Sequence, residues 1–316
     1  MVRIGEIPHL SGAGVLTSAG TATPTTLRLR LHFAGAHAAS VSLINIEDLK
    51  IMGQKFPEND LKELQSAKNL LENPGVAAKV TNLIGAPVEK GLGLLPDNWK
   101  EKIGGVTETA LMKASDAAIF TMKDLPGESS STIWHKLGVA VSGGVGGFFG
   151  ISAIAVELPI STTIMLRSIA DIARSEGESV SQVEVKLACL EVFALGGTSD
   201  ADDGTESGYY AVRAALAKSV ADAAEFLATK TLTEEGAPVL VRFIAKVAER
   251  FSIQITEKAA AQAVPAIGAA GGAIINTVFM DHFQDMAKGH FVVRRLERKH
   301  GKELVQKIYQ ELPRLG

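Results

Sequence analysis

The chain of 316 residues is short of cysteine, of aromatic residues and of net charge. Because Cys189 is the only cysteine, an intrachain disulfide is excluded, and its apolar neighbours predict a buried thiol and not a nucleophile. Aromatic residues make up 5% of the chain and hydrophobic residues 46%, so the apolar side chains are mostly aliphatic. A formal net charge of −3 gives no indication of nucleic-acid binding.

Motifs that mark catalysis or metal binding are also missing. The sequence contains no Walker-type phosphate loop, no GxSxG elbow and no HExxH pair. The acidic stretch 198–207 lacks the ligand spacing of a calcium loop and is predicted to be a solvated linker. His282, His290 and His300 are spaced too irregularly for a helical metal pair, so they are predicted to lie on the surface near a helix C-terminus. We therefore expect no metal and no cofactor.

Residues 1–50 differ from the remainder because they show no sustained helical periodicity. Glu6 and Pro8 stand where a secretory signal would have basic residues. The segment is interpreted as a disordered leader or as a start placed too far upstream, with an organellar transit peptide as the alternative. Residues 51–316 are expected to form a single helical domain.

Apolar residues recur at three- and four-residue intervals through most of this region, and the alternation typical of strands is nearly absent. Two of the clearest amphipathic patterns are formed by Val212, Leu216, Val220, Ala223 and Leu227, and by Leu240, Phe243, Val247 and Phe251. These patterns predict an all-α fold.

Two uncharged stretches rich in glycine and alanine interrupt the amphipathic patterns. The first, GVAVSGGVGGFFGISAIAVELPIS at 138–161, has no charge for nineteen positions before Glu157, and the second spans 259–280. Small residues four apart let helix backbones approach closely, so we expect a compact multi-helix domain built around two Gly/Ala-rich apolar helices. The predicted packing positions are Gly143, Gly146, Gly147, Gly150, Gly268, Ala269, Gly272 and Ala273. Both stretches also approach the length of about 20 residues that spans a bilayer, so conditional insertion stays open.

Glu157 ends the first uncharged stretch and is the strongest single candidate for a ligand-binding residue. Pro159 is predicted to begin the next helix, on which Arg167, Asp171 and Arg174 share one face. One interpretation places these charged residues at the mouth of an apolar cavity, where the arginines would bind a carboxylate or phosphate group. The alternative is an acid near a helix N-terminus beside an ordinary surface ion-pair ladder.

The C-terminal region is basic, since residues 286–316 contain eight Lys and Arg residues against three Glu residues. Arg294, Arg295, Arg298 and Lys299 are candidate contacts with the surface of an anionic membrane. The alternative is a terminal helix that docks on its own domain and keeps its charges in water. A new helix is expected to start after Gly301.

The glycine-rich segments and their neighbours resemble a known family. The segments GGVGGFFGISAIAVELPISTTIMLRSIADIARSEGE, KLACLEVFALGG and VPAIGAAGGAIINTVFMDHFQDMAKGHFVVRRLERKHG occur in the order typical of the EcsC protein family. The resemblance covers about residues 62–301. The positions that match the family pattern are Gly143, Gly147, Glu157, Pro159, Arg167, Gly268, Gly272 and Asn276. The resemblance implies a bacterial protein that is cytoplasmic or membrane-associated, and it supplies no reaction, cofactor or catalytic residue.

Three functions are compatible with these patterns. The first is a non-enzymatic helical protein in the bacterial cytoplasm or on the cytoplasmic face of the inner membrane. It would associate with the membrane peripherally or by conditional insertion, with anionic lipid or an amphiphile as its partner. The second is a soluble carrier that holds a lipid or another amphiphile in a central apolar cavity near Glu157 and Arg167. The third is an enzyme of an unrecognised class that uses the same two residues.

Overall fold

A computed structural model describes residues 56–72, 75–84, 89–95, 97–121, 150–197, 208–229, 237–263 and 268–313. The chain divides into two compact units, Met1–Ser42 and Leu43–Gly316, and all of the described residues belong to the second unit. Every regular element in these ranges is a helix, which confirms the predicted all-α fold. The hypothesis about residues 1–50 concerns residues outside the described ranges, and so do the packing roles predicted for Gly143, Gly146 and Gly147.

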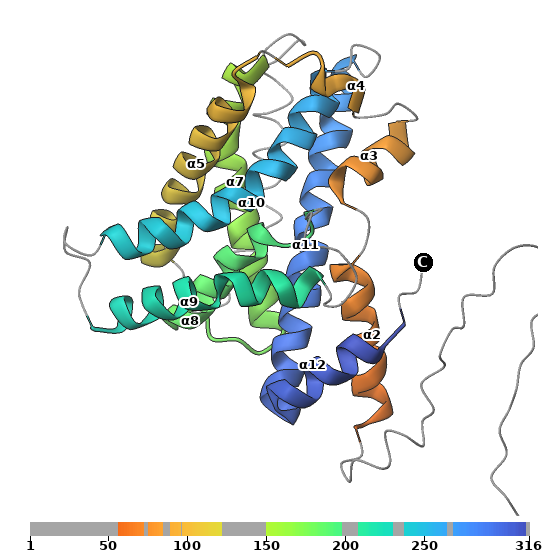
Figure 1. The fold of residues 1–316 in the computed structure, drawn as a ribbon, viewed down its shortest axis with the longest axis vertical. Helices are drawn as coiled ribbons and strands as arrows, with labels where there is room; N and C mark the ends of the chain where they lie inside the picture. Colours follow the sequence, from red (N-terminus) through yellow and green to blue (C-terminus); the bar gives the residue numbers. More distant parts are fainter. Residues whose placement is uncertain are drawn as a thin grey trace, which may run out of the picture. The chain divides into compact units, whose positions relative to one another are not determined.

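The described helices follow one another in the order labelled in Figure 1. They are α2 (Glu58–Leu71), α3 (Val76–Ile84), α4 (Glu89–Leu92), α5 (Trp99–Thr121), α7 (Gly150–Ser175), α8 (Val183–Glu191), the short 3-10 helix η1 (Val192–Ala194), α9 (Gly208–Thr229), α10 (Ala237–Ala263), α11 (Gly268–His300) and α12 (Lys302–Glu311). The helices α11, α10 and α7 contain 33, 27 and 26 residues, and the shorter helices pack on them.

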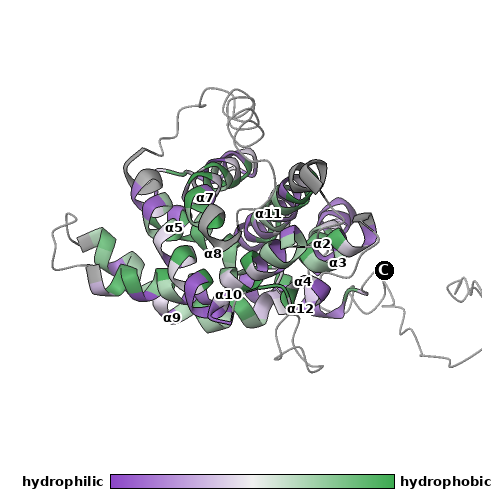
Figure 2. Ribbon diagram, turned by 90° about the horizontal axis from the view of Figure 1, so that it is seen from above, coloured by the Kyte–Doolittle hydropathy of each residue, from purple (hydrophilic) through white to green (hydrophobic). Residues whose placement is uncertain are grey.

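α7 and α11 lie side by side within this unit, as the view from above shows (Figure 2). α5 packs against α7, and α2 and α3 pack against α11. α10 crosses the other helices and contacts α3, α4, α5, α9 and α11. Each long helix therefore has neighbours on more than one side, which buries a larger part of its surface than packing against a single partner would.

The core brings together aromatic side chains from three elements. Phe193 of η1, Phe251 of α10 and Phe283 of α11 are fully buried, and their ring centroids are 4.8 to 5.4 Å apart. Rings in tilted and edge-to-face arrangements attract one another in addition to the area that they bury. The predicted amphipathic faces point inward, since Val212, Leu216, Ala223, Leu240, Phe243, Val247 and Phe251 are buried and the remaining members, Val220 and Leu227, are partly buried against the core.

Two predicted helix boundaries are wrong. Pro159 lies inside α7, which continues through that position. Proline removes the hydrogen bond to the carbonyl four residues earlier, and Ala155 is exposed, so water can bind its carbonyl instead. The stretch 259–280 is not one helix, because α10 ends before Pro265 and α11 begins after it. Within the described ranges, no helix combines the length and the apolar composition needed to cross a bilayer.

Close helix contacts occur at glycines that the sequence analysis did not single out. A Cβ atom on Gly289 of α11 would lie 2.6 Å from Leu71 Cγ and 3.0 Å from the carbonyl oxygen of Ala67, both on α2. Gly91 of α4 lies against the backbone of Ala260 on α10, where a side chain has no room. Five predicted packing positions lie in the first turns of α7 and α11, and their role stays a prediction: Gly150, Gly268, Ala269, Gly272 and Ala273.

The C-terminal helix α12 docks on α2 and α11 of its own unit. Gly301, with a φ of 91°, separates α12 from α11, as expected from the sequence. Lys68 of α2 is buried, and its Nζ donates to the carbonyl oxygens of Tyr309 and Leu312 at 2.8 and 2.7 Å. A positive charge here stabilises α12 because the carbonyl groups at a helix C-terminus carry partial negative charge.

Candidate functional site

Glu157 is paired with a lysine from another helix. Its Oε1 lies 2.6 Å from Nζ of Lys258 on α10, and the side chain of Lys258 is only 4% exposed. The same Nζ lies 5.0 Å from the centroid of the Phe279 ring on α11. α7, α10 and α11 therefore meet at one buried cation, whose burial would be costly without the carboxylate. The sequence analysis missed Lys258, although it is the last charged residue before the second uncharged stretch.

The other three residues of the predicted ligand site do not reach Glu157. Arg167 is exposed, and Asp171 and Arg174 form an ion pair with each other on α7. Ten residues of helix separate Glu157 from Arg167, which corresponds to about 15 Å along the helix axis. The four residues are thus spread along α7, and the structure does not bring them together around one carboxylate or phosphate group.

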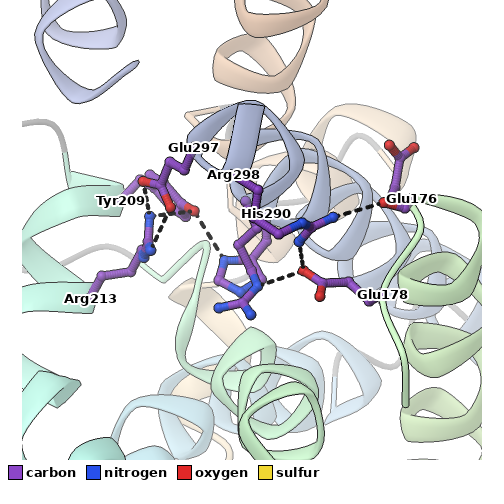
Figure 3. Close-up of polar contacts among 8 residues, drawn as sticks. Glu176, Glu178, Tyr209, Arg213, His290, Glu297 and Arg298 are labelled. Carbon is purple, nitrogen blue, oxygen red and sulfur yellow. Dashed lines mark hydrogen bonds and ion pairs between the residues drawn. The ribbon is translucent and has the colours of Figure 1, made fainter. Parts of the chain in front are cut away.

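The basic residues at the end of α11 are engaged within the chain. Arg294 and Arg298 both bind the carboxylate of Glu178, a residue that follows α7 and whose side chain is 6% exposed. Arg298 also donates to the backbone carbonyl of Glu176, as Figure 3 shows. One buried carboxylate therefore compensates two guanidinium groups.

A second set of ion pairs joins the same end of α11 to α2. Arg295 binds the carboxylates of Glu176 and Glu63 at 2.8 and 2.9 Å. Lys299 binds the carboxylate of Asp60 at 2.8 Å. The contact of these cations with anionic lipid stays a prediction, and any such lipid would compete with carboxylates of the same chain.

Two of the three histidines that were predicted to lie on the surface are buried, so that prediction is wrong. His282 and His290 are both 0% exposed, because α11 has neighbouring helices on several sides. Burial lowers the pKa of His282 to about 3, so its imidazole is neutral at physiological pH. Of the three, His300 alone is partly exposed, and its ring contacts the carboxylate of Asp60.

A buried polar network joins the start of α9 to the second half of α11 (Figure 3). The hydroxyl oxygen of Tyr209 lies 3.0 Å from Nδ1 of His290 and 3.2 Å from a guanidinium nitrogen of Arg213. Arg213 in turn donates two hydrogen bonds to the carboxylate of Glu297, at 2.8 and 3.0 Å. Tyr210 donates to the same carboxylate at 3.2 Å. We refer to these five residues as the α9–α11 network.

Burial sets the protonation states in the α9–α11 network. It lowers the pKa of His290 well below its ordinary value, together with the positive charges of Arg213 and Arg294, and it raises the pKa of Tyr209. The hydroxyl of Tyr209 therefore stays protonated and can donate a hydrogen bond to Nδ1 of a neutral His290. A general acid or base works best with a pKa near the working pH, and both of these groups have moved away from it. The network is better suited to joining two helices than to transferring protons.

Glu191, at the end of α8, is a buried carboxyl group close to the α9–α11 network. It is 6% exposed and has no hydrogen-bond partner among the described residues. Burial raises its pKa, and the nearby charges of Arg213 and Arg294 offset only part of this effect. The contribution of this group to stability therefore falls as the pH rises above its ordinary pKa of 4.5, because the unfolded chain then releases this proton while the folded chain retains it.

Replacing Glu191 by glutamine is expected to stabilise the protein at neutral pH, because the amide has no proton for the unfolded chain to lose. Below about pH 4 the carboxyl group is neutral in both states, so the advantage of the variant should vanish. Urea unfolding at a series of pH values measures both effects. Glu184→Gln, at an exposed position of the same helix, is the matched control. Parallel pH profiles for the two variants would contradict the raised pKa of Glu191.

Cys189 lies in α8 and is buried, which confirms the predicted core thiol. Burial raises the pKa of this thiol to about 12, so it is a weak nucleophile at physiological pH. In the part of the chain that the structure describes, no group of three or more His, Cys, Asp or Glu side chains is placed to hold a metal ion.

Comparison with protein-family models identifies the family of this chain. A model of the EcsC protein family matches residues 58–296, a range that begins at α2 and ends within α11. The range contains the Glu157–Lys258 pair and all members of the α9–α11 network except Glu297. Neither the curated proteins nor the solved structures contain a significant match. Because the family model covers more than half of the sequence, the chain belongs to the EcsC protein family.

Proposed function

We propose that this EcsC-family protein binds peripherally to a lipid bilayer through the end of the helical unit at which α7 and α11 begin. The observation that carries the proposal is the exposure of three aliphatic side chains in these helices. Val156 and Ile160 of α7 are 72% and 49% exposed, and Ile274 of α11 is 43% exposed. Large apolar side chains that are grouped on a surface mark a site of contact with a membrane or another molecule.

The three side chains belong to one end of the unit. The two on α7 are four residues apart and therefore share a face of the helix. Glu157, between them, pairs with Lys258, and Lys258 lies over Phe279 in the first half of α11. The first turns of α7 and α11 lie at the upper end in Figure 1, where α4 also lies. Both helices begin in uncharged stretches of the sequence, so few charges oppose contact with lipid there.

The expected affinity is modest. Complete burial of one Val or Ile side chain contributes about 1.5 to 3 kcal/mol, and each of these side chains is already partly buried. Together the three would contribute on the order of 3 kcal/mol, which favours reversible attachment over permanent anchoring.

The basic end of α11 is a weaker candidate for the same contact. Lipid phosphates would have to replace the carboxylates of Glu176 and Glu178, which lie 2.8 and 2.9 Å from Arg295 and Arg294. Breaking these pairs would leave a buried carboxylate without its cations, because the side chain of Glu178 is 6% exposed. The proposal therefore requires no anionic lipid.

Replacing Val156 and Ile160 by serine is expected to lower the partition of the protein onto phosphatidylcholine vesicles about tenfold, because two aliphatic side chains no longer enter the bilayer. Co-sedimentation with sucrose-loaded vesicles measures the partition, and circular dichroism checks that the variant is folded. The matched control is Ile253→Ser. Ile253 is 40% exposed on α10, but it lies five residues before Lys258 and so on another side of that helix.

The double variant should lose binding and the control should keep it. Equal binding by both variants, or a wild-type protein that stays in the supernatant, would refute bilayer association through this end.

A further inference from the structure

The turn after α4 holds two leucines in solvent. Leu92 is 37% exposed and Leu94 is 56% exposed. The amide of Leu94 donates to the carbonyl of Gly91 at 3.0 Å, and the amide of Leu95 donates to the carbonyl of Leu92 at 3.2 Å. The backbone of the turn is thus fixed by its own hydrogen bonds, and it holds both leucines outward.

The same turn is attached to the end of the unit that the proposed function assigns to the bilayer. Gly91 packs directly on the backbone of Ala260, two residues after the lysine that pairs with Glu157. Figure 1 shows α4 at the upper end, where α7 and α11 begin. The two leucines therefore lie at the same end of the unit as the first turns of α7 and α11.

Trp99 and several charged side chains lie close to the leucines in the sequence. The indole is half-buried, and Nζ of Lys100 lies 5.5 Å from the centroid of a Trp99 ring. The other exposed charged residues of this segment are Lys90, Asp97, Glu101 and Lys102. Tryptophan is enriched where membrane proteins meet the headgroup layer, and lysine can extend its ammonium toward that layer. Charges of both signs complement a headgroup that carries a phosphate and an ammonium group.

We propose that Leu92 and Leu94 enter the upper acyl layer of a zwitterionic phospholipid bilayer while Trp99 lies at the level of the headgroups. This inference rests on the proposed function and adds to it the orientation of the protein and the class of lipid. A protein partner is the competing occupant of the surface.

The depth of Trp99 tests the orientation. The chain has two tryptophans, so Trp134→Phe leaves Trp99 as the sole indole. With phosphatidylcholine vesicles brominated at defined positions of the acyl chains, bromines close to the headgroup should quench Trp99 more strongly than bromines near the chain ends. Equal quenching by the two lipids, or no quenching of vesicle-bound protein, would overturn the inference.

The variant Leu92→Ser/Leu94→Ser tests the insertion and the class of lipid. It should lower the partition onto phosphatidylcholine vesicles about tenfold, while Ile253→Ser again serves as the control. Replacing part of the lipid by anionic phosphatidylglycerol should leave the wild-type partition unchanged. Binding that requires phosphatidylglycerol, or that ignores the loss of both leucines, would refute the inference. Leu94→Ser alone, at the more exposed position, keeps the test valid if the double variant does not fold.

The inference and the proposed function fail in different ways. If the double variant of Val156 and Ile160 loses binding but the leucine variant retains it and Trp99 is not quenched, bilayer association stands and the contact through the α4 turn is refuted. If the wild-type protein binds no vesicle of either composition, both are refuted. A dimer in sedimentation velocity that the leucine variant abolishes would assign this surface to a second copy of the chain and would also overturn the inference.

Discussion

Replacing Arg213 by methionine is expected to lower the free energy of unfolding by about 3 kcal/mol, because it leaves the carboxylate of Glu297 buried without its cation. The side chains of Arg213 and Glu297 are 15% and 10% exposed, and two hydrogen bonds of 2.8 and 3.0 Å join them. The substitution also removes the guanidinium that donates to the hydroxyl of Tyr209. Urea unfolding at neutral pH measures the loss.

A double variant tests whether the uncompensated charge causes this loss. In Arg213→Met/Glu297→Leu neither buried charge remains, so most of the lost stability should return even though the hydrogen bonds are absent. If the double variant is as unstable as the single variant, the α9–α11 network stabilises the fold through its hydrogen bonds and packing and not through charge compensation.

Gly196→Ala is expected to cost about 3 kcal/mol or more, since it combines backbone strain with a steric clash. Gly196 has a φ of 75°, in the left-handed region that side chains disfavour. A Cβ atom there would lie 2.5 Å from Nε2 of His282 and 2.8 Å from Sδ of Met286, and both of these residues are fully buried. Chemical denaturation measures the change in the free energy of unfolding.

Gly177 offers a control that isolates the clash. Its φ is 77°, nearly the same as that of Gly196, but a Cβ atom on it would meet nothing within 4 Å. Gly177→Ala should therefore cost only the backbone strain of about 1 to 2 kcal/mol. A similar cost for the two substitutions would show that His282 and Met286 can move aside freely, against the expectation for a closely packed core.

The helices could be predicted because their evidence is local. The faces containing Leu216 and Phe243 repeat apolar residues at the spacing of a helix, and the structure buries both residues. Pro159 misled the analysis because the tolerance of a helix for proline depends on whether the freed carbonyl can reach water. That property depends on which side of α7 faces solvent, and the local sequence does not reveal it.

The burial of His282 and His290 could not be predicted from their spacing along the chain. A helix that packs on one neighbour exposes its polar residues, whereas α11 packs on α2, α3, α7, α10 and α12 and so buries them too. The number of neighbours is a tertiary property, and periodicity within one helix contains no information about it. The same reason explains why the contacts of Gly91 and Gly289 were missed.

The pair of Glu157 and Lys258 had a sequence signal that the analysis used only in part. Glu157 is the first charge after one uncharged stretch, and Lys258 is the last charge before the other. Opposite charges at the borders of two apolar segments can form an ion pair when these segments lie together in the fold. The sequence alone relates Glu157 most directly to residues further along its own helix, because i,i+4 spacing is visible in the sequence and a contact between two helices is not.

The buried ammonium of Lys68 determines how far the folded unit reaches along the chain. The EcsC match ends at residue 296, yet Tyr309 and Leu312 supply two of the oxygen atoms that surround this lysine. A polypeptide that stopped at the family boundary would retain the cation and lose these acceptors. The folded unit therefore extends beyond the family signature, because its last helix supplies carbonyl acceptors to a buried lysine near the start of the described chain.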